Sequence, residues 1–191
     1  RPSSAGGAAS PTGAPKPTPA ATTATAIAVG AAPSRRGWSM GGQHSSAPPW
    51  VCQDGVVRVL FATTELAPVA AVGGLAQAAA GLTAELRRRG DVDVEVVLPD
   101  YGAIDLDEST ATELDVPGWV GGARARRGSH RAVGPLTLID TPLLARSHPY
   151  VQPDGSGWPD NSERFFGFAA AVAALVAAER PDVIHLNDWH T

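Results

Sequence analysis

Short apolar runs separated by helical patterns organise the chain from about residue 58 onward. Residues 58–63, 94–98, 136–140 and 182–186 are rich in Val, Leu and Ile, and polar residues stand at or just beyond the end of each run. Runs of this length and composition are typical of parallel strands that are buried on both faces. We therefore predict four such strands.

Two helices are expected between these runs. The first begins at Gly73-Gly74, and three arginines at residues 87–89 stand in its last turn, where positive charge complements the helix dipole. We expect Gly90 to end this helix in a left-handed cap. Its predicted apolar stripe consists of Leu75, Ala79, Leu82 and Leu86.

The second helix follows a loop over residues 141–159. Asp160 and Glu163 have the spacing of a capping box, in which Asp160 accepts from the helix backbone and Glu163 reaches back. Pro181 marks the end of this helix. Its predicted apolar positions are Phe165, Phe168, Ala169, Val172, Leu175 and Val176.

The order of these elements predicts the fold class. Residues 103–135 carry many glycines and charges and only weak strand candidates, so we expect irregular structure there. Around this segment, strands alternate with helices, which predicts an α/β fold with a doubly wound, Rossmann-like parallel sheet. The carboxyl ends of such strands open into a crevice, so the loops after residue 63 and after residue 186 are the candidate ligand site.

Composition separates the first quarter of the chain from the rest. Residues 1–53 contain no Asp or Glu, but eight prolines and seven glycines. Such a segment buries too little apolar surface to offset the entropy of ordering it. We predict a disordered, low-complexity leader over residues 1–53 and a folded domain over residues 54–191. An acid-free segment with Arg, Ser and Ala is also typical of an organelle transit peptide, and this alternative stays open.

Several classes of function are disfavoured by charge and by residue type. Residues 54–191 carry 11 Arg against 19 Asp and Glu, a formal charge of −8, which argues against a nucleic-acid surface. The single cysteine, Cys52, excludes a disulfide framework and a cysteine-based metal site. No apolar run approaches the roughly 18 residues of a membrane-spanning helix.

Gly73 and Gly74 are the first site candidates. Their N–H groups at a helix N-terminus suit an anion or a sugar hydroxyl, although a glycine pair can equally serve as a tight turn between strand and helix. The segment does not match the G-x-G-x-x-G dinucleotide fingerprint, and no G-K-[ST] phosphate loop occurs in the chain.

Asp188, Trp189 and His190 form the second candidate group. Asp and His orient sugar hydroxyls by hydrogen bonding, and a Trp ring covers the apolar face of a sugar, but Asp188 can also serve as a turn cap. His185 and His190 are five residues apart and would point to opposite faces of a strand, so no metal site is expected. We expect His185 to be buried and satisfied by backbone. A glycosidase pair of Glu65 and Asp188 is a weaker alternative.

These motifs carry a family resemblance. From about residue 57 to residue 191 the chain resembles the N-terminal, starch-synthase catalytic domain of bacterial and plant glycogen and starch synthases. The matching motifs occur in the order of that family and are E-L-A-P at 65–68, G-G-L at 73–75, V-L-P-D-Y at 97–101, D-N-S-E-R-F at 160–165, P-D-V-I-H at 181–185 and D-W-H-T at 188–191.

The resemblance implies a retaining glucosyltransferase of the GT-B fold, which has two Rossmann-like domains and needs no metal or other cofactor. Glucose would pass from a nucleotide-glucose, expected to be ADP-glucose, to an α-1,4-glucan. The resemblance places Gly73 and Gly74 beside the donor phosphates and makes Asp188 the catalytic candidate, in contact with the transferred glucose. Gln77, Trp189 and His190 are further substrate-binding candidates.

Two features depart from the family pattern. Ala71-Val72 stands where Lys-Thr usually precedes the glycines, and Gln77 replaces an acidic residue, so another nucleotide sugar is an alternative donor. The nucleotide-binding C-terminal domain of the family is absent from this chain. We therefore expect the C-terminal domain of the same polypeptide as partner, no activity from this chain alone, and a non-catalytic glucan-binding fragment as a further alternative. We expect a cytoplasmic location, with a plastid as the alternative, and neither nucleic acid nor membrane as a partner.

Overall fold

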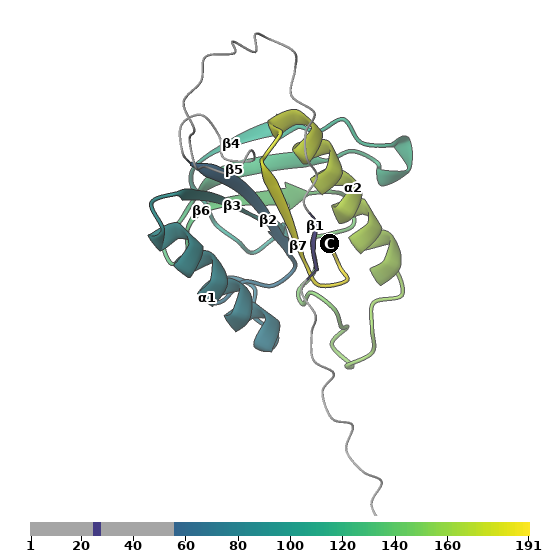
Figure 1. Cartoon of the computed structure of the whole chain (residues 1–191). Coiled ribbons are helices and arrows are strands. Elements are labelled where there is room, and N and C mark those ends of the chain that lie inside the picture. Colours follow the sequence, from purple (N-terminus) through teal and green to yellow (C-terminus); the bar gives the residue numbers. More distant parts are fainter. Residues whose placement is uncertain (1–24, 28–55) are drawn as a thin grey trace, which may run out of the picture.

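The computed structural model describes residues 25–27 and 56–191, and it contains a seven-stranded sheet and two α-helices (Figure 1). The elements in chain order are β1 (Thr25–Ile27), β2 (Val57–Thr63), α1 (Gly74–Arg88), β3 (Val92–Pro99), β4 (Asp107–Glu113), the 3-10 helix η1 (Gly118–Val120), β5 (Arg124–His130), β6 (Gly134–Asp140), α2 (Asn161–Glu179) and β7 (Val183–Asn187).

The sheet has the strand order β1-β7-β2-β3-β6-β5-β4. The four apolar runs of the sequence form its centre, β7-β2-β3-β6, and all three pairs within this centre are parallel. Antiparallel strands extend the sheet on both sides, with β1 beside β7 and the β4–β5 hairpin beside β6. The predicted α/β parallel sheet is confirmed.

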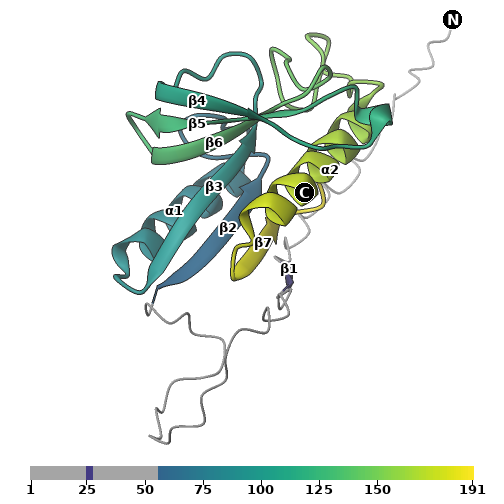
Figure 2. The ribbon, with the colours of Figure 1, turned by 90° about the horizontal axis from the view of Figure 1, so that it is seen from above.

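The two helices cover opposite faces of this sheet, as Figure 2 shows. In β2, Val59 and Phe61 pack on the face that α1 covers, whereas Leu60 and Ala62 pack on the face that α2 covers. Because successive strand residues point to opposite faces, a strand between two layers must be apolar at nearly every position. This explains the continuous apolar runs.

The chain reverses its winding between β2 and β7. From β2 it passes through α1 to β3 on one side, and from β6 it returns through α2 to β7 on the other side of β2. The carboxyl ends of the two strands are neighbours, since Thr63 pairs with Asn187 and the Asn187 side-chain amide donates to Thr63 Oγ1 at 3.2 Å. A ligand crevice of a doubly wound sheet lies at such a reversal point.

The expectation of irregular structure over residues 103–135 is wrong, because this segment contains β4, η1 and β5. All seven residues of β4 are exposed, so no apolar alternation marks the strand. The side chains of β5 form ion pairs instead of an apolar face: Arg126 binds Asp100, and Arg127 binds Glu95 and Glu179. Strands that are held by backbone pairing and charge leave no hydrophobic pattern.

The ends of the helices also differ from the prediction. The side chain of Asp160 does not cap α2 but accepts a hydrogen bond from Arg146 at 2.7 Å, so the capping box is wrong. At the end of α1, Arg89 is extended and Gly90 does not adopt a positive φ, so the left-handed glycine cap is wrong as well. Instead, the Arg87 guanidinium donates to the carbonyls of Val133 and Pro135, both at 2.6 Å.

The buried face of α1 is rotated from the predicted stripe. Its buried residues are Ala76, Ala79 and Thr83, whereas Leu82 is 40 % exposed. The Thr83 hydroxyl donates to the carbonyl of Ala79 at 2.8 Å, which satisfies the only polar group on this face. The contact of α1 with the sheet is therefore formed by these small buried side chains together with the half-buried Leu86.

Part of the predicted leader lies in the sheet. Residues 25–27 form β1, which pairs antiparallel with β7. The rest of residues 1–53, including Cys52, lies outside the described residues. The division into a leader and a domain over residues 54–191 stays a prediction.

Candidate functional site

Glu65, at the carboxyl end of β2, holds the glycine loop. Its side chain is buried, and its Oε2 accepts the N–H groups of Val72 at 3.0 Å and Gly73 at 2.9 Å. Gly73 is the N-cap of α1, and the N–H groups of Gly74 and Leu75 follow in the first turn, where no helical acceptor exists for them. The loop therefore presents donors at the positive end of a helix dipole.

The fold itself does not require either glycine. Gly73 has an extended backbone with φ −151°, and Gly74 has no positive φ. A Cβ atom at either position would meet nothing within 4 Å, and both residues are exposed. Neither a left-handed turn nor close internal packing accounts for the pair.

Tyr150 connects the glycine loop with the turn after β7. Its hydroxyl donates to Glu65 Oε1 at 2.8 Å, and the Thr64 hydroxyl must then donate to the Tyr150 oxygen at 3.0 Å. Burial raises the pKa of Tyr150, which keeps the phenol protonated and able to donate. Its ring stacks on His190, with the ring centroids 4.8 Å apart.

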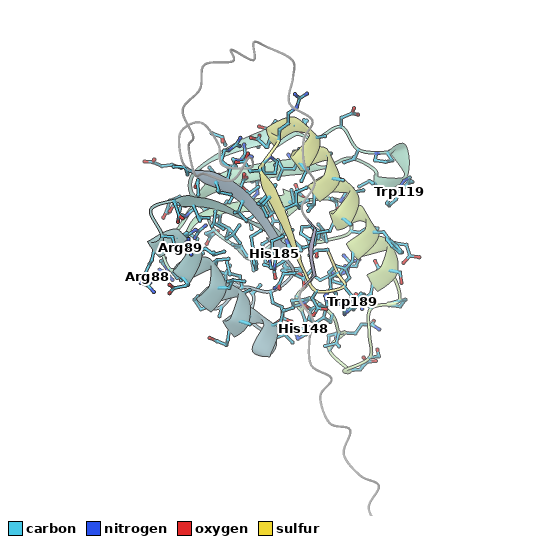
Figure 3. The ribbon with its side chains drawn as sticks, in the orientation of Figure 1. Arg88, Arg89, Trp119, His148, His185 and Trp189 are labelled. Atoms are coloured by element: carbon cyan, nitrogen blue, oxygen red, sulfur yellow. The ribbon has the colours of Figure 1, made fainter. Side chains whose placement is uncertain are left out.

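Asp188 begins a tight turn after β7. Its φ of +78° is left-handed, and its Oδ1 accepts the N–H of Trp189 at 2.7 Å. The carbonyl of Asp188 accepts the Thr191 hydroxyl at 2.9 Å. This geometry leaves the indole of Trp189 73 % exposed at the carboxyl ends of the strands (Figure 3). The carboxylate of Asp188 is therefore both a turn cap and a half-buried polar group in the crevice.

His190 is buried among aromatic rings. Its ring centroid lies 3.7 Å from that of Trp189 and 4.8 Å from that of Phe165. Its Nδ1 is buried and has no hydrogen-bond partner among the described residues. Burial lowers the pKa of His190, so the ring is neutral at pH 7.

His185 does not have the predicted backbone partner at Nε2. This buried nitrogen lacks a hydrogen-bond partner within the part of the chain that the structure describes, and the ring is only half-buried. It stacks on Phe61 with the ring centroids 4.4 Å apart, and burial lowers its pKa. The role of this ring is therefore packing inside the sheet.

The predicted site residues gather at one edge of the sheet. Gly73 and Gly74 follow β2, and the D-W-H turn at 188–190 follows β7, on either side of the reversal point. Gln77 is exposed in the first turns of α1. Sequence reasoning gave no role to Thr64 or Tyr150. Tyr150 lies after β6, a parallel strand whose carboxyl end faces the same edge, and this order is the signal that could have placed it near the site, although not its bond to Glu65.

A pocket of about 420 Å³ opens beside this cluster, between residues 69–72, 101–104 and 146–149. His148 lines it, and its Nδ1 accepts the N–H groups of Tyr150 at 3.1 Å and Val151 at 3.2 Å. A neutral His148 ring must then carry its proton on Nε2. The pocket has the volume of a small-molecule site, and its wall includes Ala71 and Val72, which directly precede the glycine pair.

The described residues offer no cluster of three or more His, Cys, Asp or Glu side chains that suits a metal ion. Neither helix in this part of the chain is long and apolar enough to cross a membrane. The site is therefore built from backbone donors, one turn carboxylate, buried hydroxyls and aromatic rings.

The described domain is similar to known proteins. The family model described as starch synthase catalytic domain matches residues 58–191. The chain is 39 % identical over 146 residues to the glycogen synthase of Dechloromonas aromatica, with 71 % of the chain and 30 % of the relative covered. It is 42 % identical over 146 residues to the glycogen synthase of Paracoccus denitrificans, with 70 % and 30 % covered. The chain thus spans about a third of the length of these relatives. It belongs to the starch synthase catalytic domain family.

Proposed function

We propose that this chain is the N-terminal part of a retaining glucosyltransferase that moves glucose from a nucleotide-glucose, ADP-glucose in the first instance, to an α-1,4-glucan. The relatives that it matches are named glycogen synthases. The observation that carries the proposal is the exposed glycine pair at the N-terminus of α1, which stands at the reversal point of the sheet although the fold does not require it.

The glycine loop is the proposed site of the donor phosphates. The N–H groups of Gly74 and Leu75 and the dipole of α1 favour an anion, and the missing Cβ atoms let it approach the backbone closely. Glu65 already occupies the N–H groups of Val72 and Gly73, so it fixes the loop instead of leaving all four donors to the ligand.

The turn at 188–190 is the proposed site of the transferred glucose. The Asp188 carboxylate suits a hydrogen bond from a sugar hydroxyl, and the exposed Trp189 indole suits the apolar face of the ring. The ring of His190 packs against the indole, with the ring centroids 3.7 Å apart. Gln77, which is exposed in the first turns of α1, is the remaining proposed substrate-binding residue.

The proposed activity needs the rest of the polypeptide. Stabilisation of the leaving phosphate would come from the nucleotide-binding domain, so we expect no transfer by residues 1–191 alone. Phe166 and Trp189 are 69 % and 73 % exposed and line one small apolar hollow with Phe165 and Ala169. This surface suits contact with the C-terminal domain of the same polypeptide. We expect the protein in the cytoplasm, with a plastid as the alternative.

One observation favours a different donor. Ala71 and Gln77 are exposed beside the glycines, and the loop of residues 64–74 carries no cation to meet a diphosphate. A related enzyme that uses another nucleotide sugar is therefore the second candidate.

The test is to express the complete reading frame that encodes this chain and to measure glucose transfer to glycogen from ADP-glucose and from UDP-glucose. We expect transfer from ADP-glucose, with retention at the anomeric carbon. Transfer only from another nucleotide sugar would establish the second candidate. Glycogen binding without transfer from any nucleotide sugar would leave a glucan-binding protein and refute the catalytic proposal.

A further inference from the structure

Arg164, in the first turn of α2, is a fully buried cation that takes part in none of the ion pairs of the described residues. The nearby carboxylate of Asp160 pairs with Arg146. A guanidinium without a carboxylate is costly to bury unless all of its donors are bonded to other acceptors. The reason for its presence therefore lies in those acceptors.

Its acceptors are almost all backbone carbonyls of one loop. Nε donates to Leu143 at 3.0 Å, and Nη2 donates to Leu144 at 3.2 Å. Nη1 donates to the carbonyl of Pro149 at 2.9 Å and to Asn161 Oδ1 at 2.8 Å. One side chain thus ties both ends of the segment 143–149 to the helix.

Asn161 extends this clamp by one residue, because its side-chain amide donates to the carbonyl of Tyr150 at 2.9 Å. From Tyr150 the hydrogen bonds continue through Glu65 to the N–H of Gly73. A path of hydrogen bonds, continued through the covalent structures of Tyr150 and Glu65, therefore leads from α2 to the N-terminus of α1. It joins segments that are far apart in the sequence.

We propose that Arg164 is a positioning residue for the glycine loop: by fixing the segment 143–149 it holds the Tyr150 hydroxyl against Glu65, whose carboxylate sets the Val72 and Gly73 amides. The inference rests on the proposed function in that this loop is the part that receives the donor. The link itself is a property of this chain and is measurable without any donor.

The geometry requires a guanidinium in particular. Its planar fork reaches the carbonyls of Leu143, Leu144 and Pro149 at once, whereas the ammonium of a lysine is a single point with a different direction. Arg164→Lys would keep the charge and most of the volume but lose the simultaneous contacts. The segment 143–149 would then be free to shift, and Tyr150 with it.

The experiment is amide hydrogen exchange, followed by NMR, on the 191-residue chain and on Arg164→Lys. We expect the Val72 and Gly73 amides to exchange about tenfold faster than in the unsubstituted chain, as for the loss of one hydrogen bond. We also expect the ring signals of His190 to shift, because Tyr150 stacks on it. The buried amide of Val96 exchanges through global unfolding, so its rate reports global stability separately from the local opening of the loop.

Arg127→Lys is the matched control. Arg127 also makes several side-chain bonds, to Glu95 and Glu179, but these join β5 to β3 and α2 away from the loop of Tyr150. It should lower global stability, and so speed exchange at Val96, without changing exchange at Gly73 or the signals of His190. Glu65→Gln, which directly weakens the hydrogen bonds to the Val72 and Gly73 amides, is the positive control.

Unchanged Gly73 exchange in Arg164→Lys, together with faster Gly73 exchange in Glu65→Gln, would overturn the inference. If Arg164→Lys does not fold, Asn161→Ala tests the same clamp, and the same two outcomes decide. These results are independent of glucose transfer, so the proposed function can fail while the link stands, and the reverse.

Discussion

Tyr150 donates a hydrogen bond to Glu65 Oε1 at 2.8 Å across 85 residues of sequence. The bond joins the loop after β6 to the loop after β2 at the carboxyl edge of the sheet. Both oxygens of the Glu65 carboxylate therefore accept hydrogen bonds from inside the protein, and this carboxylate links Tyr150 to the Val72 and Gly73 amides. The contribution of this hydrogen bond to the free energy of unfolding can be measured directly.

Tyr150→Phe should lower the free energy of unfolding by about 1–3 kcal/mol, because it leaves a buried carboxylate oxygen of Glu65 without its donor. The aromatic stack on His190 is kept, so the effect isolates the hydroxyl. Urea unfolding followed by tryptophan fluorescence measures the change. Tyr150→Leu, which also removes the ring, should cost more, and equal losses for the two variants would contradict the assignment.

Gly74→Ala should leave the fold intact and stabilise it by up to about 1 kcal/mol, because the position is helical and a Cβ meets nothing within 4 Å. Transfer by the complete enzyme should nevertheless fall by about tenfold or more if a phosphate lies against this backbone. Gly81→Ala, in the middle of the same helix and equally open, is the control with unchanged transfer. Full activity in Gly74→Ala would remove the glycine loop from the proposed donor site.

Gly128→Ala should destabilise the protein by about 1–3 kcal/mol, because a Cβ atom would lie 2.8 Å from the carbonyl oxygen of Asp107 and 3.0 Å from the Cβ of Leu106. The neighbour is backbone of β4 and cannot rotate away. Thermal unfolding of Gly128→Ala against Gly81→Ala gives the comparison. A neutral result would mean that the β4–β5 hairpin shifts freely.

Stability should fall on acidification below about pH 6.5, the ordinary pKa of histidine. Burial lowers the folded-state pKa of His190 and of His185, so the unfolded chain binds protons before the folded one does. The loss begins at the unfolded pKa and stops growing once pH has passed the lowered folded value. Above pH 7 both states are neutral and these rings contribute no slope.

Replacement of His190 by Phe tests this sign. The variant keeps the aromatic packing against Tyr150 and Trp189 but cannot take up a proton. Between pH 7 and pH 5 the unsubstituted chain should lose more unfolding free energy than His190→Phe does. A constant difference over this range would show that His190 does not titrate with unfolding.

The central sheet and both helices followed from the sequence because burial on two faces leaves long apolar runs, as in β2 and β7. The hairpin of β4 and β5 did not, since Arg126 and Arg127 are held by carboxylates from other elements and carry no local pattern. The capping box failed for a similar reason: Arg146, in the loop that leads from β6 to α2, binds the Asp160 carboxylate.

Some residues of the candidate site could likewise be proposed from the sequence, and others could not. Gly73, Gly74 and Asp188 could be chosen as candidates from the sequence because they lie in the segments that follow β2 and β7, where the carboxyl ends of parallel strands open. The role of Tyr150 could not be inferred in this way, because it depends on a contact with Glu65 that only the folded chain creates. The same holds for Arg164, whose pattern is that of an ordinary polar residue near a helix start.

The far end of α1 has a consequence for how the site can move. Arg87 anchors that end to the carbonyls of Val133 and Pro135, while the glycines stand at the opposite end. A shift of α1 along its axis would break both of these hydrogen bonds. The N–H groups at the glycine end of the helix are therefore held in position relative to β6, although β6 lies at the other end of the helix.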